Sequence, residues 1–384
     1  MRSPSSAVSA MPRSGIRDIF DIAGRTDGVI HLEIGEPNYP TPDHIIEAAA
    51  AAGRAGFTKY TANRGLLEVR EAMGRKIATH NGFEVDVDDI VITSGALNGL
   101  LGALMVLLDP GETVLLPDPA WPNYMMMAGL VGARVERYPL DPEHDFEPDM
   151  DAFEAIAATT NAKVLVVNTP GNPTGAVFTR QTLERITDVA RRHDLWIVSD
   201  ECYDALVFDG EHTSLAALDD PGRVVSVFSV SKTYAMTGWR IGYVAAPPRI
   251  ADLMSKVQEA MIGCATAVSQ KAAQAALEGD QSCVETMRAG YRARRDRAVE
   301  MLSDSGLLAS RPHGAFYVMA TIGPAQVGDV EFCRRLIVDE GVAVAPGVGF
   351  GPAARGMVRI SLATDEDHLV EGLRRLIRAV QDGA

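Results

Sequence analysis

Short apolar runs alternate with longer amphipathic segments through the middle of the chain. Residues 164–168, 195–199 and 224–228 are rich in β-branched side chains and end at polar or turn-forming residues, as buried strands do. Between these runs, segments such as residues 182–193 repeat apolar positions at helical spacing. This alternation predicts an α/β fold, in which a mostly parallel sheet is covered by helices on both faces.

The same patterns give the other expected elements. Further strands are expected at residues 29–34, 90–93, 113–116 and 134–138, and further helices at 42–53, 66–80, 97–108, 121–131 and 150–159. The pattern changes after residue 245 and predicts a smaller α+β domain. That part contains long helices within 248–304, short strands near 316–320, 342–345 and 357–361, and a final helix to about residue 382.

These elements suggest how the chain is divided. We expect a flexible arm at residues 1–14, because this segment carries little periodicity. A large domain is expected at residues 45–285, and a small domain is expected from residues 15–44 together with 286–384. His31, within the first predicted strand, is expected to be a packed core residue.

Composition and charge narrow the possible partners. The formal net charge of −15 disfavours a nucleic-acid backbone or an anionic membrane. The four cysteines form no Cys-x-x-Cys pair and no His/Cys cluster, so neither a zinc site nor a disulfide framework is expected. No apolar run approaches the ~20 residues that span a bilayer, and the N-terminus lacks the apolar segment of a signal peptide. We therefore expect a cytoplasmic protein without a metal.

The chemically distinctive residues follow three of the predicted parallel strands. Residues 169–175 follow one strand, 200–203 the next and 229–232 the third, and ligands bind at the carboxyl ends of such strands. A lysine such as Lys232 becomes a nucleophile toward carbonyl groups when burial or cationic neighbours lower its pKa. The serines beside it and Arg240 are donors suited to a phosphate. A lysine beside a phosphate site is what pyridoxal phosphate (PLP) requires.

Three motifs carry a resemblance to a known family. They are Ser-x-Ser-Lys-x-x-x-Met-x-Gly-x-Arg-x-Gly at residues 229–242, Asn-Pro-Thr-Gly at 172–175 and Asp-Glu-x-Tyr at 200–203. Together they resemble the PLP-dependent aminotransferases of the aspartate aminotransferase superfamily (fold type I, class I/II). The resemblance extends from about Gly35 to Ser361, which is nearly the whole chain.

The resemblance implies roles for the residues around the cofactor ring. Lys232 is expected to form the Schiff base and to act as the general base, and Asp200 is expected to face the pyridine nitrogen. Tyr203 and Asn172 are expected to donate to the 3-oxygen of the ring. Trp121 is expected to stack on the ring and, like Asn172, to border the substrate.

It also implies the phosphate and carboxylate sites. The phosphate is expected to contact Gly95, Ala96, Ser229, Ser231 and Arg240, where a strand, a glycine turn and a helix N-terminus favour an anion. Tyr60 resembles the tyrosine that reaches the neighbouring subunit's phosphate, which implies a homodimer with shared active sites. Arg359 resembles the arginine that binds the substrate α-carboxylate, and Gly35 is expected beside it.

One departure from the family pattern concerns the substrate. In the aspartate-specific branch, a lysine that reads the distal carboxylate follows the phosphate turn, and here that position is Leu97. Neutral or aromatic L-amino acids are therefore expected to be better donors than aspartate. Arg64 from the partner's loop is the candidate to bind the distal carboxylate of a 2-oxo acid acceptor such as 2-oxoglutarate. The alternative is that Arg64 is a solvated loop arginine. The resemblance implies a ping-pong reaction.

Two other functions remain as alternatives. A lyase or synthase on the same fold, catalysing β-elimination, decarboxylation or an ACC-synthase-like step, shares the motifs, although Arg359 favours retention of the α-carboxylate. A ligand-sensing regulator would carry an added DNA-binding domain, and fewer than 35 residues precede Gly35 here. The family also predicts cis peptides at Asn172-Pro173 and Asp118-Pro119.

Overall fold

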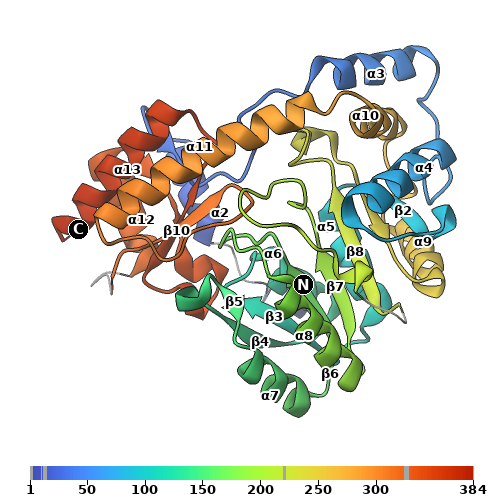
Figure 1. Ribbon diagram of the computed structural model, residues 1–384, viewed down its shortest axis with the longest axis horizontal. Coiled ribbons are helices and arrows are strands. Elements are labelled where there is room, and N and C mark those ends of the chain that lie inside the picture. Colours follow the sequence, from blue (N-terminus) through green and yellow to red (C-terminus); the bar gives the residue numbers. More distant parts are fainter. Residues whose placement is uncertain (1–2, 10, 12–14, 219–221, 324–327, 384) are drawn as a thin grey trace.

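A computed structural model describes residues 3–9, 11, 15–218, 222–323 and 328–383 (Figure 1). Its larger sheet has eight strands within these residues and runs through the centre of the molecule. The strand order is β2 (Ile90–Thr93), β9 (Gly242–Ala245), β8 (Val224–Ser229), β7 (Trp196–Asp200), β6 (Ala162–Asn168), β3 (Thr113–Asp118), β4 (Arg134–Asp141) and β5 (Glu147–Pro148).

Strands β8, β7, β6, β3 and β4 are parallel, which confirms the predicted mostly parallel sheet. Strand β9 lies antiparallel between β8 and β2, and the sequence patterns did not predict it as a strand. Only residues 230–241 separate β8 from β9, and they contain the Lys232 segment. This connection contains no α-helix, and parallel strands are usually joined through one, which agrees with the antiparallel return of the chain.

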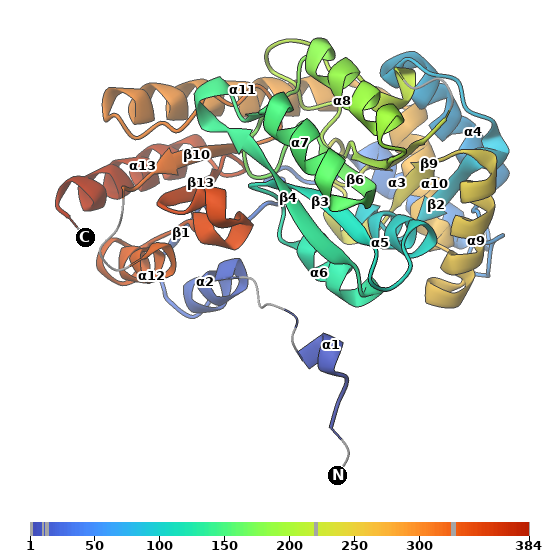
Figure 2. The ribbon, with the colours of Figure 1, turned by 90° about the horizontal axis from the view of Figure 1, so that it is seen from below.

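Both faces of the larger sheet are apolar because neighbouring strand residues point to opposite sides. Val114 and Val164 pack under α5 (Ala96–Leu107), α6 (Asn123–Val131) and α9 (Pro248–Ile262). Leu115 and Leu165 pack under α7 (Met150–Thr160) and α8 (Arg180–Arg192) on the other face. Figure 2 shows these two helical layers with the sheet between them.

A third apolar cluster covers the β2 and β9 end of the sheet. It contains residues of α3 (Asp43–Arg54), α4 (Leu67–Lys76) and α10 (Ala267–Glu278). Helix α4 ends earlier than predicted and continues as a wider π turn, Ile77–Asn81, which Gly82 closes by donating its N–H to the Ile77 carbonyl.

The smaller sheet is antiparallel and has the order β10 (Tyr317–Thr321), β13 (Met357–Ser361) and β12 (Ala345–Pro346). Beside it, β1 (Ile30–His31) pairs with β11 (Val342–Ala343), so the N-terminal segment lies with the C-terminal part of the chain. The surrounding helices are α2 (Gly15–Ala23), α11 (Ser282–Asp304), α12 (Asp329–Glu340) and α13 (Glu366–Gln381). The predicted domain limits stay a prediction.

The first residues leave the body of the molecule (Figure 2). The predicted arm at 1–14 lies partly outside the described residues, and the described part contains a short helix, α1 (Ser6–Ser9). The strand predicted to residue 34 ends at His31. The prediction that His31 is a core residue is wrong, because its side chain is 40% exposed and its ring contacts buried Glu33.

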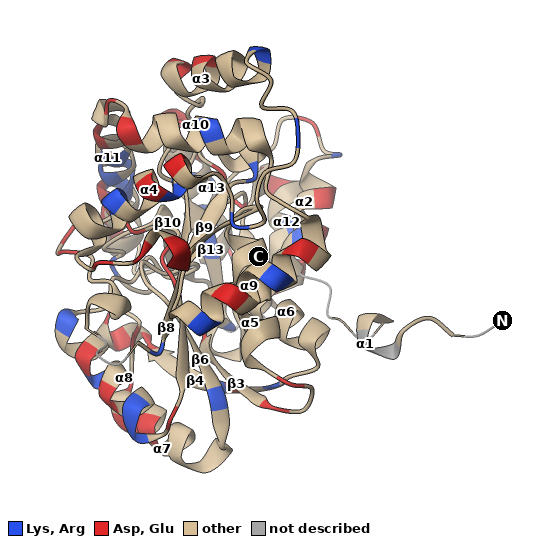
Figure 3. Cartoon of the chain, turned by 90° about the vertical axis from the view of Figure 1, so that its right-hand side faces the viewer, with Lys and Arg blue, Asp and Glu red and all other residues tan. Residues whose placement is uncertain are grey.

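Charged groups are spread over the surface. Figure 3 shows basic and acidic residues interspersed along α8, whereas the charged residues of α7 are the acidic Asp151 and Glu154. Among the described residues, no helix combines the length and the apolar character that crossing a membrane requires. The peptides Asp118-Pro119 and Asn172-Pro173 are cis, as predicted, and Thr169-Pro170 is cis as well.

Candidate active site

A cavity of about 460 Å³ lies where the carboxyl ends of β6, β7 and β8 meet the smaller sheet. Most of the residues predicted from the sequence line this single cavity, although they come from segments far apart in the chain. They are Gly35, Ala96, Trp121, Asn172, Asp200, Tyr203, Ser229, Ser231, Lys232, Arg240 and Arg359. Gly95 lies directly behind the lining, and Tyr60 lies elsewhere.

Lys232 stands in the loop that follows β8, and its Nζ donates to the Gly35 carbonyl at 2.7 Å. Burial lowers the pKa of Lys232 to about 8, so a larger fraction of this amine is neutral than in solvent. Only glycine fits at position 35, since a Cβ there would lie 2.3 Å from the Tyr317 hydroxyl. The neutral amine is the form that attacks a carbonyl group.

Asp200 ends β7 and is 4% exposed. Its Oδ2 accepts from the Tyr124 hydroxyl at 2.5 Å, and its Oδ1 accepts from the Cys202 N–H at 3.2 Å. Burial raises the pKa of Asp200, whereas these hydrogen bonds lower it. The result is a buried carboxylate that is held at a fixed angle at the floor of the cavity.

Two asparagines join the neighbouring loops at the ends of β6 and β7. Asn168 Nδ2 donates to the Asp200 carbonyl at 3.0 Å, and Asn168 Oδ1 accepts from the Asn172 N–H at 2.9 Å. Asn172 Oδ1 accepts from Arg359 Nη1 at 3.0 Å. Because its oxygen is used in this way, Asn172 can present its Nδ2 donor to a ligand.

Arg359 projects from β13 of the smaller sheet and is 4% exposed. Its Nη2 donates to the Glu33 carbonyl at 2.5 Å, and its guanidinium lies 4.3 Å from the Tyr317 ring centroid and 4.9 Å from that of Phe350. Burial lowers the pKa of Arg359. Its buried Nε has no hydrogen-bond partner among the described residues. A buried cation with an unused donor is suited to a carboxylate.

The hydroxyls of Tyr203 and Tyr317 lie 2.9 Å apart beside Arg359. Burial raises the pKa of both groups, so both stay protonated at neutral pH. One hydroxyl donates to the other, which leaves one hydrogen for a ligand.

Donors for an anion gather at the N-terminus of α5. Gly95, at φ +80°, precedes this helix, and a Cβ on it would lie 2.7 Å from Arg240 Nη2. Arg240 Nη1 donates to the Thr237 carbonyl at 2.8 Å, and the Ser231 N–H donates to Ser229 Oγ at 3.1 Å. The helix N-terminus, a guanidinium and two hydroxyls match a phosphate.

The mouth of the cavity is formed by some residues that the sequence predicted and by others that it did not. Trp121 packs edge-on against Tyr124 at 5.5 Å, and Leu97 is 37% exposed at the rim. Helix α2 adds Ile16, Arg17 and Phe20, and the sequence patterns did not predict this helix.

Tyr60 and Arg64 do not reach this cavity in one protomer. Tyr60 is 94% exposed. Arg64 donates to the Asp88 carbonyl and forms an ion pair with Asp252 of its own chain. The ion pair of Arg64 with Asp252 supports the alternative that Arg64 is a loop residue. The exposure of Tyr60 leaves its side chain available to a second protomer.

Sequence reasoning missed several residues of the site. Tyr124, Asn168 and Tyr317 hold Asp200, Asn172 and Tyr203. Tyr124 lies three residues after the predicted Trp121, and Asn168 ends a predicted strand, so both positions offered a signal. Tyr317 and the α2 residues offered none, because only the packing of the smaller sheet brings them to the cavity.

Comparison with known proteins agrees with this geometry. The family model described as aminotransferase class I and II matches residues 27–376. The chain is 39% identical to aromatic-amino-acid aminotransferase 2 of Thermococcus litoralis over 374 residues, which cover 96% of each protein. It is also 39% identical to the aspartate/prephenate aminotransferase of Thermus thermophilus over 366 residues, which cover 93% of this chain and 92% of the relative.

Solved structures show the same fold. The aspartate aminotransferase of Thermus thermophilus with maleate superimposes with a TM-score of 0.93 at 37% identity, covering 99% of this chain and 100% of the other. A Pyrococcus protein, titled protein-A1, superimposes with a TM-score of 0.94 at 39% identity, covering 98% of both chains. The chain therefore belongs to the class I and II aminotransferases of the aspartate aminotransferase superfamily, and it is an aminotransferase.

Proposed function

We propose that this aminotransferase uses PLP to move the amino group of a neutral or aromatic L-amino acid to a 2-oxo acid such as 2-oxoglutarate. The observation that carries the proposal is the meeting of Lys232, Asp200, Arg240 and Arg359 in one cavity. These residues fit the cofactor, because a buried amine with a pKa of about 8, a buried carboxylate and an anion site are the three contacts that it needs. The bound cofactor would supply an electron sink for the α-carbon.

Each residue then has a proposed task. Lys232 holds the cofactor and afterwards carries the proton that leaves and returns to the substrate. Asp200 keeps the pyridine nitrogen protonated, and Tyr203 and Asn172 hold the 3-oxygen. Arg359 fixes the substrate α-carboxylate, so the group that is lost is the α-proton and not CO₂. Donor and acceptor share one α-carboxylate site, which supports a ping-pong order.

The phosphate site would be completed by a second protomer. Gly95, Ala96, Ser229, Ser231 and Arg240 supply donors from one chain. We infer that Tyr60, which is 94% exposed in one protomer, reaches a neighbour's phosphate in a homodimer. The cytoplasmic location stays a prediction from the sequence.

The preference for neutral donors rests on the rim of the cavity. Leu97 is apolar, and Ile16 and Phe20 of α2 add apolar surface to the cavity, which Arg17 of the same helix also lines. A distal carboxylate that lies against Leu97 and away from Arg17 stays partly desolvated without a partner, at a cost of roughly 1–3 kcal/mol or about ten- to a hundredfold in relative efficiency. The lyase alternative has less support, because the relatives are named aminotransferases.

A donor panel tests this proposal. The purified protein, loaded with PLP, is mixed with each amino acid, and the loss of cofactor absorbance and the formation of the 2-oxo acid are followed. Phenylalanine, tyrosine, leucine, methionine or alanine should exceed aspartate in kcat/KM. A higher kcat/KM for aspartate than for all five would overturn the preference. Formation of β-elimination products without the 2-oxo acid that corresponds to the donor would overturn transamination as the reaction.

A further inference from the structure

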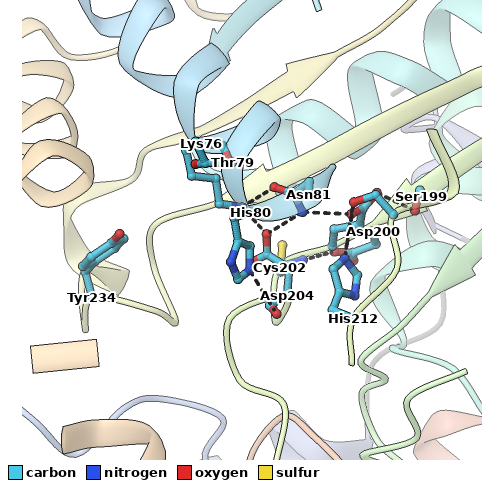
Figure 4. Close-up of polar contacts among 12 residues, drawn as sticks. Lys76, Thr79, His80, Asn81, Ser199, Asp200, Cys202, Asp204, His212 and Tyr234 are labelled. Atoms are coloured by element: carbon cyan, nitrogen blue, oxygen red, sulfur yellow. Dashed lines mark hydrogen bonds and ion pairs between the residues drawn. The ribbon is translucent and has the colours of Figure 1, made fainter. Parts of the chain in front are cut away.

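A connected group of buried polar side chains lies behind the turn at residues 200–204 (Figure 4). Asp200, Cys202 and Tyr203 of this turn line the active-site cavity. Asp204 lines a second cavity of about 510 Å³ between α4, α10 and α11, and Glu201 is 1% exposed. The turn therefore sends two carboxylates away from the active site into the protein.

Glu201 is held by donors from separate segments of the chain. It accepts from Ser199 Oγ at 3.0 Å, from His212 Nε2 at 2.9 Å and from the Ser214 hydroxyl. Asn81 Nδ2 adds a longer contact of 3.4 Å. Because a buried carboxylate without partners is strongly unfavourable, these contacts restrict where residue 201 can lie.

Asp204 is held by Lys76 and Asn81. Lys76 Nζ forms an ion pair with Asp204 Oδ2, and Asn81 Nδ2 donates to the same oxygen at 3.1 Å. Burial acts to raise the pKa of Asp204, but the charge of Lys76 and its hydrogen bond contribute to bringing it down to about 2. Lys76 Nζ also donates to Asn81 Oδ1 at 2.8 Å, which ties the two residues to each other.

The local backbone explains why Lys76 and Asn81 meet. In a regular α-helix, residues five apart lie about 140° apart around the axis. The π turn Ile77–Asn81 widens the helix, so Asn81 returns to the side of Lys76. His80, whose pKa is lowered by burial, adds a contact from its Nε2 to the Asp204 carbonyl at 3.4 Å.

The same lysine also touches the strand that precedes the Lys232 loop. Lys76 Nζ lies 4.7 Å from the centroid of the Phe228 ring on β8. Ser229, the next residue, lines both cavities, so a single layer of chain separates the Lys76 side from the cofactor side. The end of α4 therefore contacts both the turn that follows Asp200 and the strand that precedes Lys232.

We propose that Lys76 and Asn81 are positioning residues of the cofactor site. Through Glu201 and Asp204 they fix the turn at 200–204, so that Asp200 and Tyr203 face the cofactor without rearrangement. This inference rests on the proposed use of PLP. Neither residue touches the cofactor cavity, so their effect passes through the turn.

The test uses two variants and a matched control. Lys76→Met removes the charge and keeps the length of the side chain. Asn81→Ala removes the amide that contacts Lys76, Glu201 and Asp204, while leaving the ion pair between Lys76 and Asp204. Lys163→Met is the control, because Lys163 pairs with Glu112 at 2.7 Å near the amino end of β6, whereas the site lies at the carboxyl ends of the strands. Two quantities are measured: amide hydrogen exchange of residues 200–206 in the cofactor-free protein, and the dissociation constant of PLP.

In both variants the amide hydrogens of residues 200–206 should exchange faster. PLP should bind about tenfold more weakly, since small displacements of binding residues cost this much or more. Lys163→Met should match the unmodified protein. Unchanged exchange and affinity overturn the inference, and so does faster exchange with unchanged affinity, which would mark the network as structural only. If Lys76→Met does not fold, Asn81→Ala decides by the same two readings. Failure of the unmodified protein to bind PLP would overturn the proposed function instead, and with it the role of these residues toward that cofactor.

Discussion

Tyr124→Phe removes one hydroxyl from the buried carboxylate of the site. Tyr124 is 1% exposed, and its hydroxyl donates to Asp200 Oδ2 at 2.5 Å. The ring that remains still packs edge-on against Trp121, so the shape of the cavity is kept. The substitution therefore isolates one hydrogen bond to Asp200.

A hydrogen bond to a charged acceptor contributes about 1.5–3 kcal/mol, which is about ten- to a hundredfold in an equilibrium or a rate. Burial already raises the pKa of Asp200, and the bond from Tyr124 opposes that rise. Without the hydroxyl, the pKa of Asp200 rises further, and less of the carboxylate form is available to pair with a protonated ring nitrogen. We expect kcat/KM to fall about ten- to a hundredfold.

The assay measures kcat/KM across pH for the PLP-loaded variant. The loss should be greatest on the acid side, because protonation of Asp200 then begins at a higher pH. Tyr138→Phe is the control, since Tyr138 is also buried and donates to the Val166 carbonyl at 2.8 Å, within the sheet. A Tyr124→Phe enzyme with the kcat/KM and pH profile of the Tyr138→Phe enzyme would refute the reasoning.

Four further substitutions test the assigned roles. Lys232→Ala should fold, lose the visible absorbance of the bound cofactor and lose most turnover, and near-native turnover would remove Lys232 from its central role. Asp200→Asn should bind PLP yet react about a hundredfold more slowly or worse, because a neutral amide cannot keep the ring nitrogen protonated; wild-type kinetics would contradict this. Arg64→Ala should weaken the use of 2-oxoglutarate while sparing pyruvate, and equal effects on both acceptors would leave Arg64 a loop residue. Arg17→Ala is tested in parallel, because Arg17 lines the cavity, where it forms an exposed 3.4 Å ion pair with Asp21 and lies 5.1 Å from the Phe20 ring centroid, and a selective loss in that variant would assign the distal charge to α2 instead.

The larger sheet could be predicted because most of its strands can be recognised from runs of apolar residues within their own sequence. Residues 164–168 and 224–228 are apolar on both sides, which is what strands covered on both faces require. Strand β9 was missed although residues 241–246 are apolar, because a run of this length does not by itself distinguish a strand from a buried helix segment. His31 was misassigned because a strand of two residues has no periodicity to show which side faces solvent.

The site could be predicted where residues follow strand ends in recognisable motifs. Lys232, Asp200 and Asn172 belong to this class. Tyr317 and the α2 residues reach the cavity only because the smaller sheet packs against the larger one, and no spacing in the sequence records that contact. The network of Lys76 and Asn81 was equally hidden, because it depends on a π turn within a segment that reads as ordinary helix.

Helix α11 contacts both the helices over the larger sheet and the smaller sheet. Its first turns pack with the helices over the larger sheet through Val284, whereas Met287 and Tyr291 begin its contact with the smaller sheet. Further along, Arg294 Nη1 donates to the Leu362 carbonyl at 2.9 Å, just after the strand that carries Arg359.

The 23 residues of α11 make a rod of about 34 Å, so a tilt of about 2° at its start moves its far end by about 1 Å. The helix therefore ties the position of the strand that carries Arg359 to the helices that cover the larger sheet.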